Sequence, residues 1–222
     1  MSATGLLQGA SDNLTGLAQP VRIPASAHQI QQEQICERAD AIIRKLQKSG
    51  YEAYLVGGCV RDLLLGLIPK DFDIATSAHP EQVRKIFSSA RLIGRRFRLA
   101  HIYYGRVYIE VAIFRALHDD SSQGQVNEQG RILHDNVYGS LEEDVWRRDF
   151  TINALFYDPV SGDVIDYVDG MQDLAKRRLH LIGDAEQRYR EDPVRMLRAL
   201  RFAAKLDFEL DGPTGELIYS MG

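Results

Sequence analysis

The stretch Leu55-Val-Gly-Gly-Cys-Val-Arg-Asp62 decides the fold, together with Asp71-Phe-Asp73 a short distance further on. The first stretch is typical of a strand that ends in paired glycines and passes into a helix carrying Arg61 and Asp62. Glycines let a backbone approach a ligand closely, and the N-terminus of a helix offers free N–H groups to phosphate oxygens. The first stretch therefore predicts a phosphate-binding turn.

Asp71 and Asp73 place two carboxylates at positions i and i+2. We expect them in a strand over residues 71–75, where both side chains point to one face, roughly 6.6 Å apart along the chain. Mg²⁺ takes hard oxygen ligands and leaves positions open for substrate phosphates. An isolated Asp-x-Asp is more typical of a turn or a helix cap. Beside a phosphate-binding turn, however, the carboxylate pair predicts phosphoryl or nucleotidyl transfer.

The composition is that of an ordinary soluble globular chain, with 45% hydrophobic and 26% charged residues among 222. The net charge of −4 gives no global sign of nucleic-acid binding. Charge is unevenly distributed, however, because residues 84–106 are basic and residues 117–144 are acidic. The two cysteines, Cys36 and Cys59, have no metal-ligand spacing, and we find no membrane span or signal peptide. A cytoplasmic protein is therefore expected.

The hydrophobic pattern predicts a mixed α/β head domain over residues 28–182 and the start of a helical domain over residues 183–222. Residues 1–27 are rich in small and polar residues and predict a disordered lead-in. We expect helices at 28–49, 59–65, 80–87 and from 170, strands at 51–56, 71–75, 154–157, 163–167 and 179–182, and a hairpin over 98–115 turning at Gly105. Residues 117–145 are long and polar and are expected to form a mobile loop.

A helix is predicted from Asp192, which suits the N-cap, with Pro193 at the first helical position. A helical wheel separates two sides of this helix. The apolar arc consists of Met196, Leu197, Leu200, Ala203 and Ala204. The opposite side carries Arg195, Arg198 and Arg201.

Glu110 is the best candidate for a third carboxylate beside Asp71 and Asp73. It lies on the polar face of the second arm of the hairpin, among apolar neighbours. Three carboxylates can hold two Mg²⁺ ions about 3.5–4 Å apart, which stabilise both the attacking hydroxyl and the leaving pyrophosphate. The alternative is that these carboxylates only cap turns.

These motifs resemble, in order, those of the class II nucleotidyltransferases, the family of tRNA CCA-adding enzymes and bacterial poly(A) polymerases. The resemblance is carried by residues 57–62, 71–73, 110–115, 147–155, 169–174 and 191–202. It implies a nucleotidyltransferase head with a mixed, largely antiparallel sheet flanked by helices, followed by a helical neck. It also implies transfer of AMP from ATP to the 3′ end of RNA without a template, with two Mg²⁺ ions, Mn²⁺ being the alternative metal.

Within the family, the basic segment 92–101 and the segment 189–199 resemble the bacterial poly(A) polymerases more than the CCA-adding enzymes. Two alternatives stay open. The first is a CCA- or A-adding enzyme, which would use CTP and a tRNA acceptor end. The second is a head that binds ATP and Mg²⁺ without extending RNA, because the family's enzymes continue well beyond the position of Gly222 into domains that bind RNA. On that reading the chain is truncated, and the exposed apolar side of helix 193–206 associates with a partner.

The resemblance assigns a role to each site residue. Asp71, Asp73 and Glu110 are expected to hold the metals, and Asp149 is a second-ranked catalytic residue. Nucleotide binding is assigned to Gly57, Gly58 and Arg61 at the triphosphate, to Arg148, Asp149 and Asn153 at phosphate and ribose, and to Asp192 and Arg195 at the base.

Three further expectations concern neighbouring side chains. Asp62 is expected to brace Arg61, and Cys59 to be a small apolar filler. RNA binding is assigned to Arg95, Arg96 and Arg98, because neutralised phosphates supply affinity. Purely structural roles stay open as alternatives: Asn153 could cap a turn, Asp192 and Arg195 could form an ion pair, and the basic segment could be solvated surface.

Overall fold

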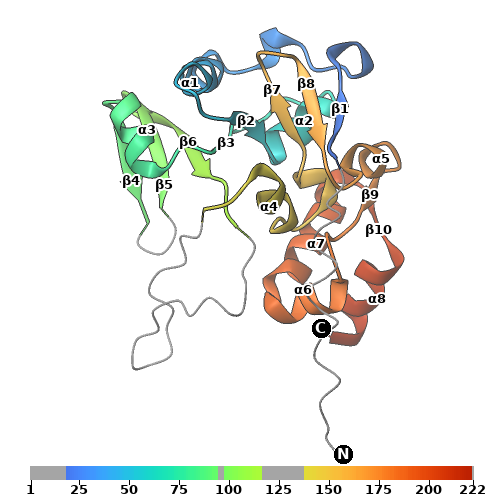
Figure 1. Cartoon of the computed structure of the whole chain (residues 1–222). Coiled ribbons are helices and arrows are strands. Elements are labelled where there is room, and N and C mark those ends of the chain that lie inside the picture. Colours follow the sequence, from blue (N-terminus) through green and yellow to red (C-terminus); the bar gives the residue numbers. More distant parts are fainter. Residues whose placement is uncertain (1–18, 95–97, 117–137, 222) are drawn as a thin grey trace, which may run out of the picture.

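The computed structural model describes residues 19–94, 98–116 and 138–221, so residues 1–18, 95–97, 117–137 and 222 lie outside the description (Figure 1). Eight strands form one sheet in the order β1-β8-β7-β2-β3-β6-β5-β4. β3 and β6 run parallel, and the other neighbouring strands of this sheet are antiparallel. The expected mixed, largely antiparallel sheet flanked by helices is confirmed.

Strands and helices are interspersed along the described chain, with β4, β5 and β6 in succession and β7 followed directly by β8. The strands of the main sheet are β1 (Val21–Ile23), β2 (Ala53–Val56), β3 (Ile74–Thr76), β4 (Ala90–Ile93), β5 (Leu99–Tyr104), β6 (Val107–Ile113), β7 (Phe156–Asp158) and β8 (Asp163–Asp166). The helices are α1 (Glu37–Lys48), α2 (Gly58–Leu64), α3 (Pro80–Ile86), α4 (Leu141–Trp146), α5 (Gly170–Ala175), α6 (Ala185–Glu191), α7 (Val194–Leu206) and α8 (Gly212–Met221). Short 3₁₀ turns occur at η1 (Ala25–Ala27), η2 (Gln32–Gln34) and η3 (Thr151–Asn153), and a small parallel pair joins β9 (Arg178–Leu179) to β10 (Glu209–Leu210).

The middle of the sheet is buried on both faces. Along β2, Leu55 joins the large cluster that α1, α2 and α3 complete, whereas Tyr54 and Val56 join a second cluster with Val145 of α4. Side chains alternate between the faces of a strand, so an apolar run such as this one is typical of a strand covered on both sides. The glycine-rich turn that follows β2 is therefore anchored on a rigid support.

The three C-terminal helices α6, α7 and α8 pack beneath the end of this sheet (Figure 1). Tyr189 of α6 is fully buried and donates its hydroxyl hydrogen to the carbonyl of Thr214 in α8. Phe202 of α7 packs edge-on against Phe150 at 5.9 Å between ring centroids. Both side chains belong to the same core cluster as the sheet, so the core is continuous across the boundary expected near residue 182.

Several expected boundaries were wrong, and each for a physical reason. β1 lies inside the expected disordered lead-in, because pairing with β8 supplies backbone hydrogen bonds that its own sequence does not predict. The helix expected from residue 28 begins at Glu37, after two 3₁₀ turns. Residues 71–73 precede β3 instead of belonging to it. α4 begins within the expected loop 117–145, where Ser140 caps it by accepting the N–H of Glu143.

β4 was missed entirely, because it is short and its pattern is weak, and it forms by pairing with β5. The hairpin, by contrast, is confirmed as β5 and β6, with the turn at Gly105. On α7, the predicted apolar arc is largely open to solvent, with Leu197 68% and Leu200 47% exposed, while Ala199, Phe202 and Leu206 are buried. The bulky ring of Phe202, and not the count of aliphatic residues, decides which side of the helix faces the core.

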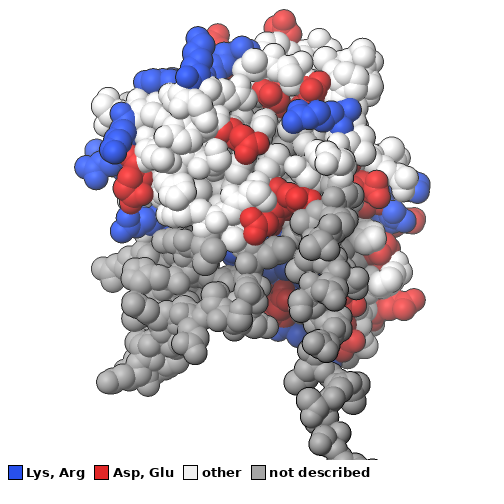
Figure 2. All heavy atoms as spheres, viewed as in Figure 1, with Lys and Arg blue, Asp and Glu red and all other residues white. Residues whose placement is uncertain are grey.

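Charge is unevenly spread over the face drawn in Figure 2, where most of the visible basic side chains gather over α1 and α3. Both helices carry lysine or arginine in their last turns, which suits the negative end of a helix dipole. Acidic side chains are scattered over the middle and the right of the same view. Within the described residues, no helix is long and apolar enough to cross a membrane.

Candidate active site

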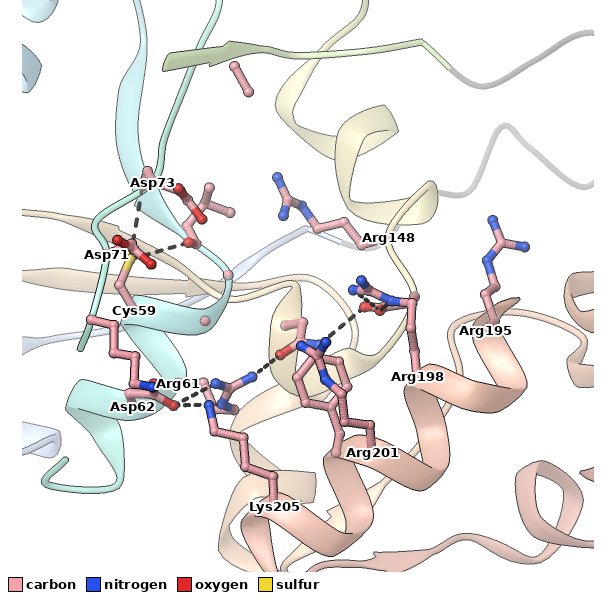
Figure 3. Close-up of a pocket in the computed structure, with 18 of the residues that line it drawn as sticks. Cys59, Arg61, Asp62, Asp71, Asp73, Arg148, Arg195, Arg198, Arg201 and Lys205 are labelled. Carbon is pink, nitrogen blue, oxygen red and sulfur yellow. Dashed lines mark hydrogen bonds and ion pairs between the residues drawn. The ribbon is translucent and has the colours of Figure 1, made fainter. Parts of the chain in front are cut away.

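A cavity of about 860 Å³ lies where the end of the sheet meets α7 (Figure 3). It collects nearly all of the site residues expected from the sequence. They are Gly57, Gly58, Arg61, Asp71, Asp73, Glu110, Arg148, Asp149, Asn153, Asp192 and Arg195. The side chains come from opposite walls, since Asp71 and Asp73 lie beside α2, and Arg195, Arg198, Arg201 and Lys205 project from α7 (Figure 3).

The turn between β2 and α2 forms one edge of this cavity. Gly57 has a φ of 77° and a ψ of −131°, a conformation that a residue with a Cβ adopts only under strain. Its N–H donates to the carbonyl of Leu155 on the neighbouring segment, at 3.2 Å. The first turn of α2 then begins at Gly58, where N–H groups have no acceptor within the helix. Gly57 and Gly58 line the cavity, so the phosphate-binding role of this turn stays a prediction that its position suits.

Three carboxylates, those of Asp71, Asp73 and Glu110, line the cavity near the start of β3. The register pairs Ile74 with Val111, so that Asp73, just before β3, lies alongside Glu110 on β6. The carbonyl of Asp73 accepts the N–H of Val56 at 3.1 Å, which fixes the extended segment 71–73 beside β2. Burial raises the pKa of Asp73, the charges of Glu110 and Asp71 raise it further, and the charge of Arg148 opposes them. Mutual repulsion of this kind is what a bound cation relieves.

The carboxylates fit a divalent cation in their chemistry but are not drawn together into a finished site. Among the described residues, no group of three or more His, Cys, Asp or Glu side chains is close enough to hold a metal. Asp71, Asp73 and Glu110 supply hard oxygen donors, which Mg²⁺ prefers. The metal role of these three residues stays a prediction that the structure suits, since the raised pKa of Asp73 reports burial and repulsion that a bound cation would relieve.

A chain of hydrogen bonds joins α2 to α7 across the floor of the cavity. Arg61 is 3% exposed, and it donates to Oδ1 of Asp62 at 2.6 and 2.9 Å and to Oδ1 of Asn153 at 2.6 Å. Asn153 donates through Nδ2 to Oδ1 of Asp149 at 3.2 Å. Arg198 of α7 then donates to the other oxygen of Asp149, Oδ2, at 2.5 and 2.7 Å.

This chain of hydrogen bonds bears on the expectations for Asp62, Asn153 and Asp149. Asp62 does brace Arg61, as expected. Asn153 bridges two charged side chains in the same chain, so its side chain does more than cap a turn. Asp149 is engaged by Arg198, and the carboxylates whose charges act on Asp73 are Glu110 and Asp71. The structure therefore places Asp149 on the α7 side of the cavity, and a catalytic role for it through the metals stays untested.

Arg148 reaches toward the carboxylates from the segment just after α4 (Figure 3). Its guanidinium is held by Asp144 one helical turn earlier, with Nη2 2.7 Å from Oδ2, and it lies over the ring of Phe156. Cys59 is buried in the first turn of α2. Burial raises its pKa to about 12, so the thiol stays protonated. The expectation that Cys59 is an apolar filler agrees with this environment.

Asp192 and Arg195 both line the cavity but do not pair with each other in the way considered from the sequence. Asp192 accepts the N–H of Val194 at 3.2 Å and so stabilises the first turn of α7. Arg195 donates to Glu191 at 3.1 Å and to the carbonyl of Arg188 at 2.7 Å. Burial acts to raise the pKa of Glu191, but the hydrogen bond from Arg195 and the charge of Arg188 outweigh it and lower that pKa.

The expected RNA contacts lie mostly beyond what is described. Arg95 and Arg96 fall outside the described residues. Arg98 is described and is about half exposed, with Nη1 2.8 Å from Oε1 of Glu81. An exposed pair of this kind is worth roughly 0.2–1 kcal/mol, so it leaves Arg98 available to a phosphate.

The sequence missed several cationic members of the site. Lys70, Arg147, Arg198, Arg201 and Lys205 all line the cavity. The spacing of the last three repeats at three and four residues on one side of α7, which is a helical signal that the sequence already contained. Glycine donors, three carboxylates and a row of cations on one cavity define a phosphoryl- or nucleotidyl-transfer site.

Comparison with known proteins agrees with this class. Residues 53–180 match the family model described as the poly A polymerase head domain. Poly(A) polymerase I of Salmonella typhimurium is 55% identical over 200 residues, which cover 88% of this chain and 43% of the relative. A CCA-adding enzyme of Lactobacillus delbrueckii is 39% identical over 185 residues, covering 83% of this chain and 45% of the relative. The chain therefore belongs to the poly(A) polymerase head-domain family.

Solved structures agree in fold. A crystal structure of the Bacillus stearothermophilus CCA-adding enzyme in complex with CTP has a TM-score of 0.69 at 38% identity, covering 80% of this chain and 41% of that one. A tRNA nucleotidyltransferase complexed with a primer tRNA and an incoming ATP analogue has a TM-score of 0.61 at 31% identity, covering 81% and 49%. The chain spans less than half the length of the curated relatives named here.

Proposed function

We propose that this chain is the catalytic head of a template-independent RNA nucleotidyltransferase that transfers AMP from ATP to RNA 3′ ends. The observation that carries the proposal is the single cavity that joins the turn at Gly57, the three carboxylates and the basic edge of α7. A nucleoside triphosphate matches this arrangement, because its anionic phosphates suit backbone N–H groups and arginines. Relatives named poly(A) polymerase I are more similar than those named CCA-adding enzyme, which favours polyadenylation.

In the proposed reaction, the 3′ oxygen of RNA forms a bond to the α-phosphorus of ATP, and the bond from that phosphorus to the bridging oxygen of pyrophosphate breaks. Asp71, Asp73 and Glu110 are the residues that would hold Mg²⁺, with Mn²⁺ as the alternative. Bound there, the metal would supply positive charge that lowers the pKa of the attacking hydroxyl. Asp71, Asp73 and Glu110 all line the cavity. Since the metal would lower the pKa of the hydroxyl, the proposal needs no protein side chain as the base, and the proton would pass to solvent.

The other residues bind and orient the substrate. The first turn of α2 and Arg148 are proposed to hold the triphosphate, supported by the direction in which Arg148 points (Figure 3). Asp192 and Arg195 are proposed at the base, where a protein surface takes the place of a template. Asp149 and Asn153 are proposed to contact the ribose. Their side-chain oxygens already accept hydrogen bonds from Arg198 and Arg61, respectively, so the ribose would share these acceptors. Arg61 acts from beneath the turn, since its guanidinium is buried.

The experiment is extension of a short labelled RNA with Mg²⁺ and each nucleoside triphosphate separately, beside the double variant Asp71→Ala/Asp73→Ala. A ladder made from ATP alone and lost in the double variant would support the proposal. Use of CTP, or addition only to a tRNA end, would transfer the assignment to CCA addition. Binding of ATP without extension would leave a nucleotide-binding head that needs further RNA contacts.

Two further expectations remain proposals. Cys36 and Cys59 are both free thiols, which supports the expected cytoplasmic location.

Val194, Leu197 and Leu200 are exposed along α7, which supports the proposed association with a partner through this helix.

A further inference from the structure

A second cavity adjoins the same carboxylates. Its volume is about 660 Å³, and it shares Lys70, Asp71, Asp73 and Glu110 with the active-site cavity. The remainder of its wall is different and consists of Cys36, Phe72, Arg106, Val107, Tyr108 and Ile109. In an in-line displacement the attacking and leaving oxygens lie on opposite sides of the phosphorus, so two substrates need separate approaches to the carboxylates. The two cavities provide two such approaches.

An aromatic surface leads to this second cavity along β5 and β6. His101 pairs with Glu110 and Tyr103 with Tyr108 across the two strands, so all four side chains share one face. The rings of His101 and Tyr108 are stacked, with centroids 4.1 Å apart and planes 6° apart, and the ring of Tyr103 lies 5.6 Å from that of Tyr108. Arg91 of β4 lies over Tyr103 at 5.0 Å. We call His101, Tyr103, Tyr108 and Arg91 the aromatic face.

The aromatic face is not part of the core. The opposite face of the same strands carries Ala100, Ile102, Ile109 and Val111, which pack with α1 and α3. Tyr108, by contrast, is 48% exposed although it is a large aromatic residue. A ring that packs against neighbouring rings and is still about half exposed is a platform on which another flat ring can stack. An arginine beside it adds a cation for a phosphate or for a base.

We infer that the aromatic face binds the bases at the 3′ end of the acceptor RNA and that the second cavity leads its 3′ hydroxyl to the carboxylates. Tyr108 and Glu110 are two residues apart on one face of β6, roughly 6.6 Å along the strand, so a base on Tyr108 brings its own ribose close to Glu110. Tyr108 does not line the cavity assigned to ATP, which separates this surface from the incoming nucleotide. Stacking accepts every base, which suits an acceptor of no fixed sequence.

This inference rests on the proposed function, and its test separates the two. Affinity for fluorescein-labelled oligoadenylate is measured by anisotropy for Tyr108→Leu, for Tyr108→Phe and for Tyr219→Leu, a matched control because Tyr219 is 92% exposed on α8. Tyr108→Leu is expected to weaken RNA binding about 5- to 160-fold, because stacking on one aromatic ring contributes that much per base. Tyr108→Phe and Tyr219→Leu are expected to bind as the unchanged protein does, and Mg²⁺-dependent ATP binding is expected to be equal in all four.

A photochemical measurement on the unchanged protein avoids any effect of substitution on folding. An RNA carrying 5-iodouridine at its 3′ end is expected to cross-link to Tyr108 or Tyr103, as located by mass spectrometry. Cross-links elsewhere, together with an RNA affinity of Tyr108→Leu equal to that of the unchanged protein, would overturn the proposed role of the aromatic face. The proposed function would still stand if the unchanged protein extended RNA. Absence of both RNA binding and extension in the unchanged protein would overturn both.

Discussion

Replacing Asp62 by leucine tests how far the fold depends on the buried charge of Arg61. Arg61 is 3% exposed, and two of its three hydrogen bonds end on Asp62. Leucine has a similar volume but no acceptor, so the guanidinium would stay buried with only Asn153 as a partner. Removing one partner of a buried ion pair costs about 3–5 kcal/mol, because the other charge is left uncompensated. For a chain of this length that corresponds to a fall of roughly 6–20 °C in Tm.

The assay is thermal and urea-induced unfolding of a double-mutant cycle. Asp62→Leu is expected to lose about 3–5 kcal/mol of the free energy of unfolding, and Arg61→Met/Asp62→Leu to recover much of it, because two apolar residues leave no buried charge. Glu186→Gln provides the control, since it breaks the Glu186–Arg190 ion pair between two exposed side chains, and is expected to cost about 0.5 kcal/mol or less. A loss below about 1 kcal/mol in Asp62→Leu would refute the reasoning, because water in the cavity would then be solvating Arg61.

Three further predictions concern the glycine turn and the carboxylates. Gly57→Ala is expected to lower the free energy of unfolding in urea by about 1–2 kcal/mol, because Gly57 has a positive φ, and to weaken ATP binding. Gly105→Ala is the control: Gly105 has a φ of 66° in the hairpin turn, so this variant should lose similar stability and keep its ATP affinity. Because the pKa of Asp73 is raised in the fold, the metal-free protein loses stability as pH rises from the ordinary aspartate range through that raised pKa. In EDTA, Asp73→Asn should therefore raise Tm at neutral pH and have no such effect in acid. Mg²⁺ at about 100 times its Kd should raise Tm by roughly 5–11 °C, and Asp71→Asn/Asp73→Asn should abolish that rise.

The parts of the fold that sequence could predict are those whose cause is local. The β5–β6 hairpin follows from alternation of apolar and polar residues on both sides of Gly105, whose positive φ suits the turn. β1 was missed because it is short and forms by pairing with β8, which is distant in sequence, and β4 because it is short and its own pattern is weak. Asp71 and Asp73 share a cavity as expected, yet they do so from an extended segment before β3 and not from within a strand.

The same division holds within the active site. The residues proposed to bind phosphate and metal could be picked out because they lie close together in sequence, in the glycine turn and the Asp-x-Asp. Their partners were not, because Arg61 and Asn153 are separated by 92 positions and Asp149 and Arg198 by 49. No local pattern reports a hydrogen bond of that range, so the connection between α2 and α7 becomes evident only in three dimensions.

Phe202 explains why α7 presents its arginines, and not its aliphatic arc, to the site. Its ring packs edge-on against Phe150 and lies under the guanidinium groups of Arg61, Arg198 and Arg201, each 5.3–5.5 Å from the ring centroid. With this ring buried beside Ala199 and Leu206, the basic edge of α7 lines the cavity, and Leu197 and Leu200 are exposed. The proposed function requires that α7, the helix proposed to contact the base, is held at a fixed angle to the carboxylates. Here the packing of one aromatic ring and the Arg198–Asp149 ion pair together fix that angle.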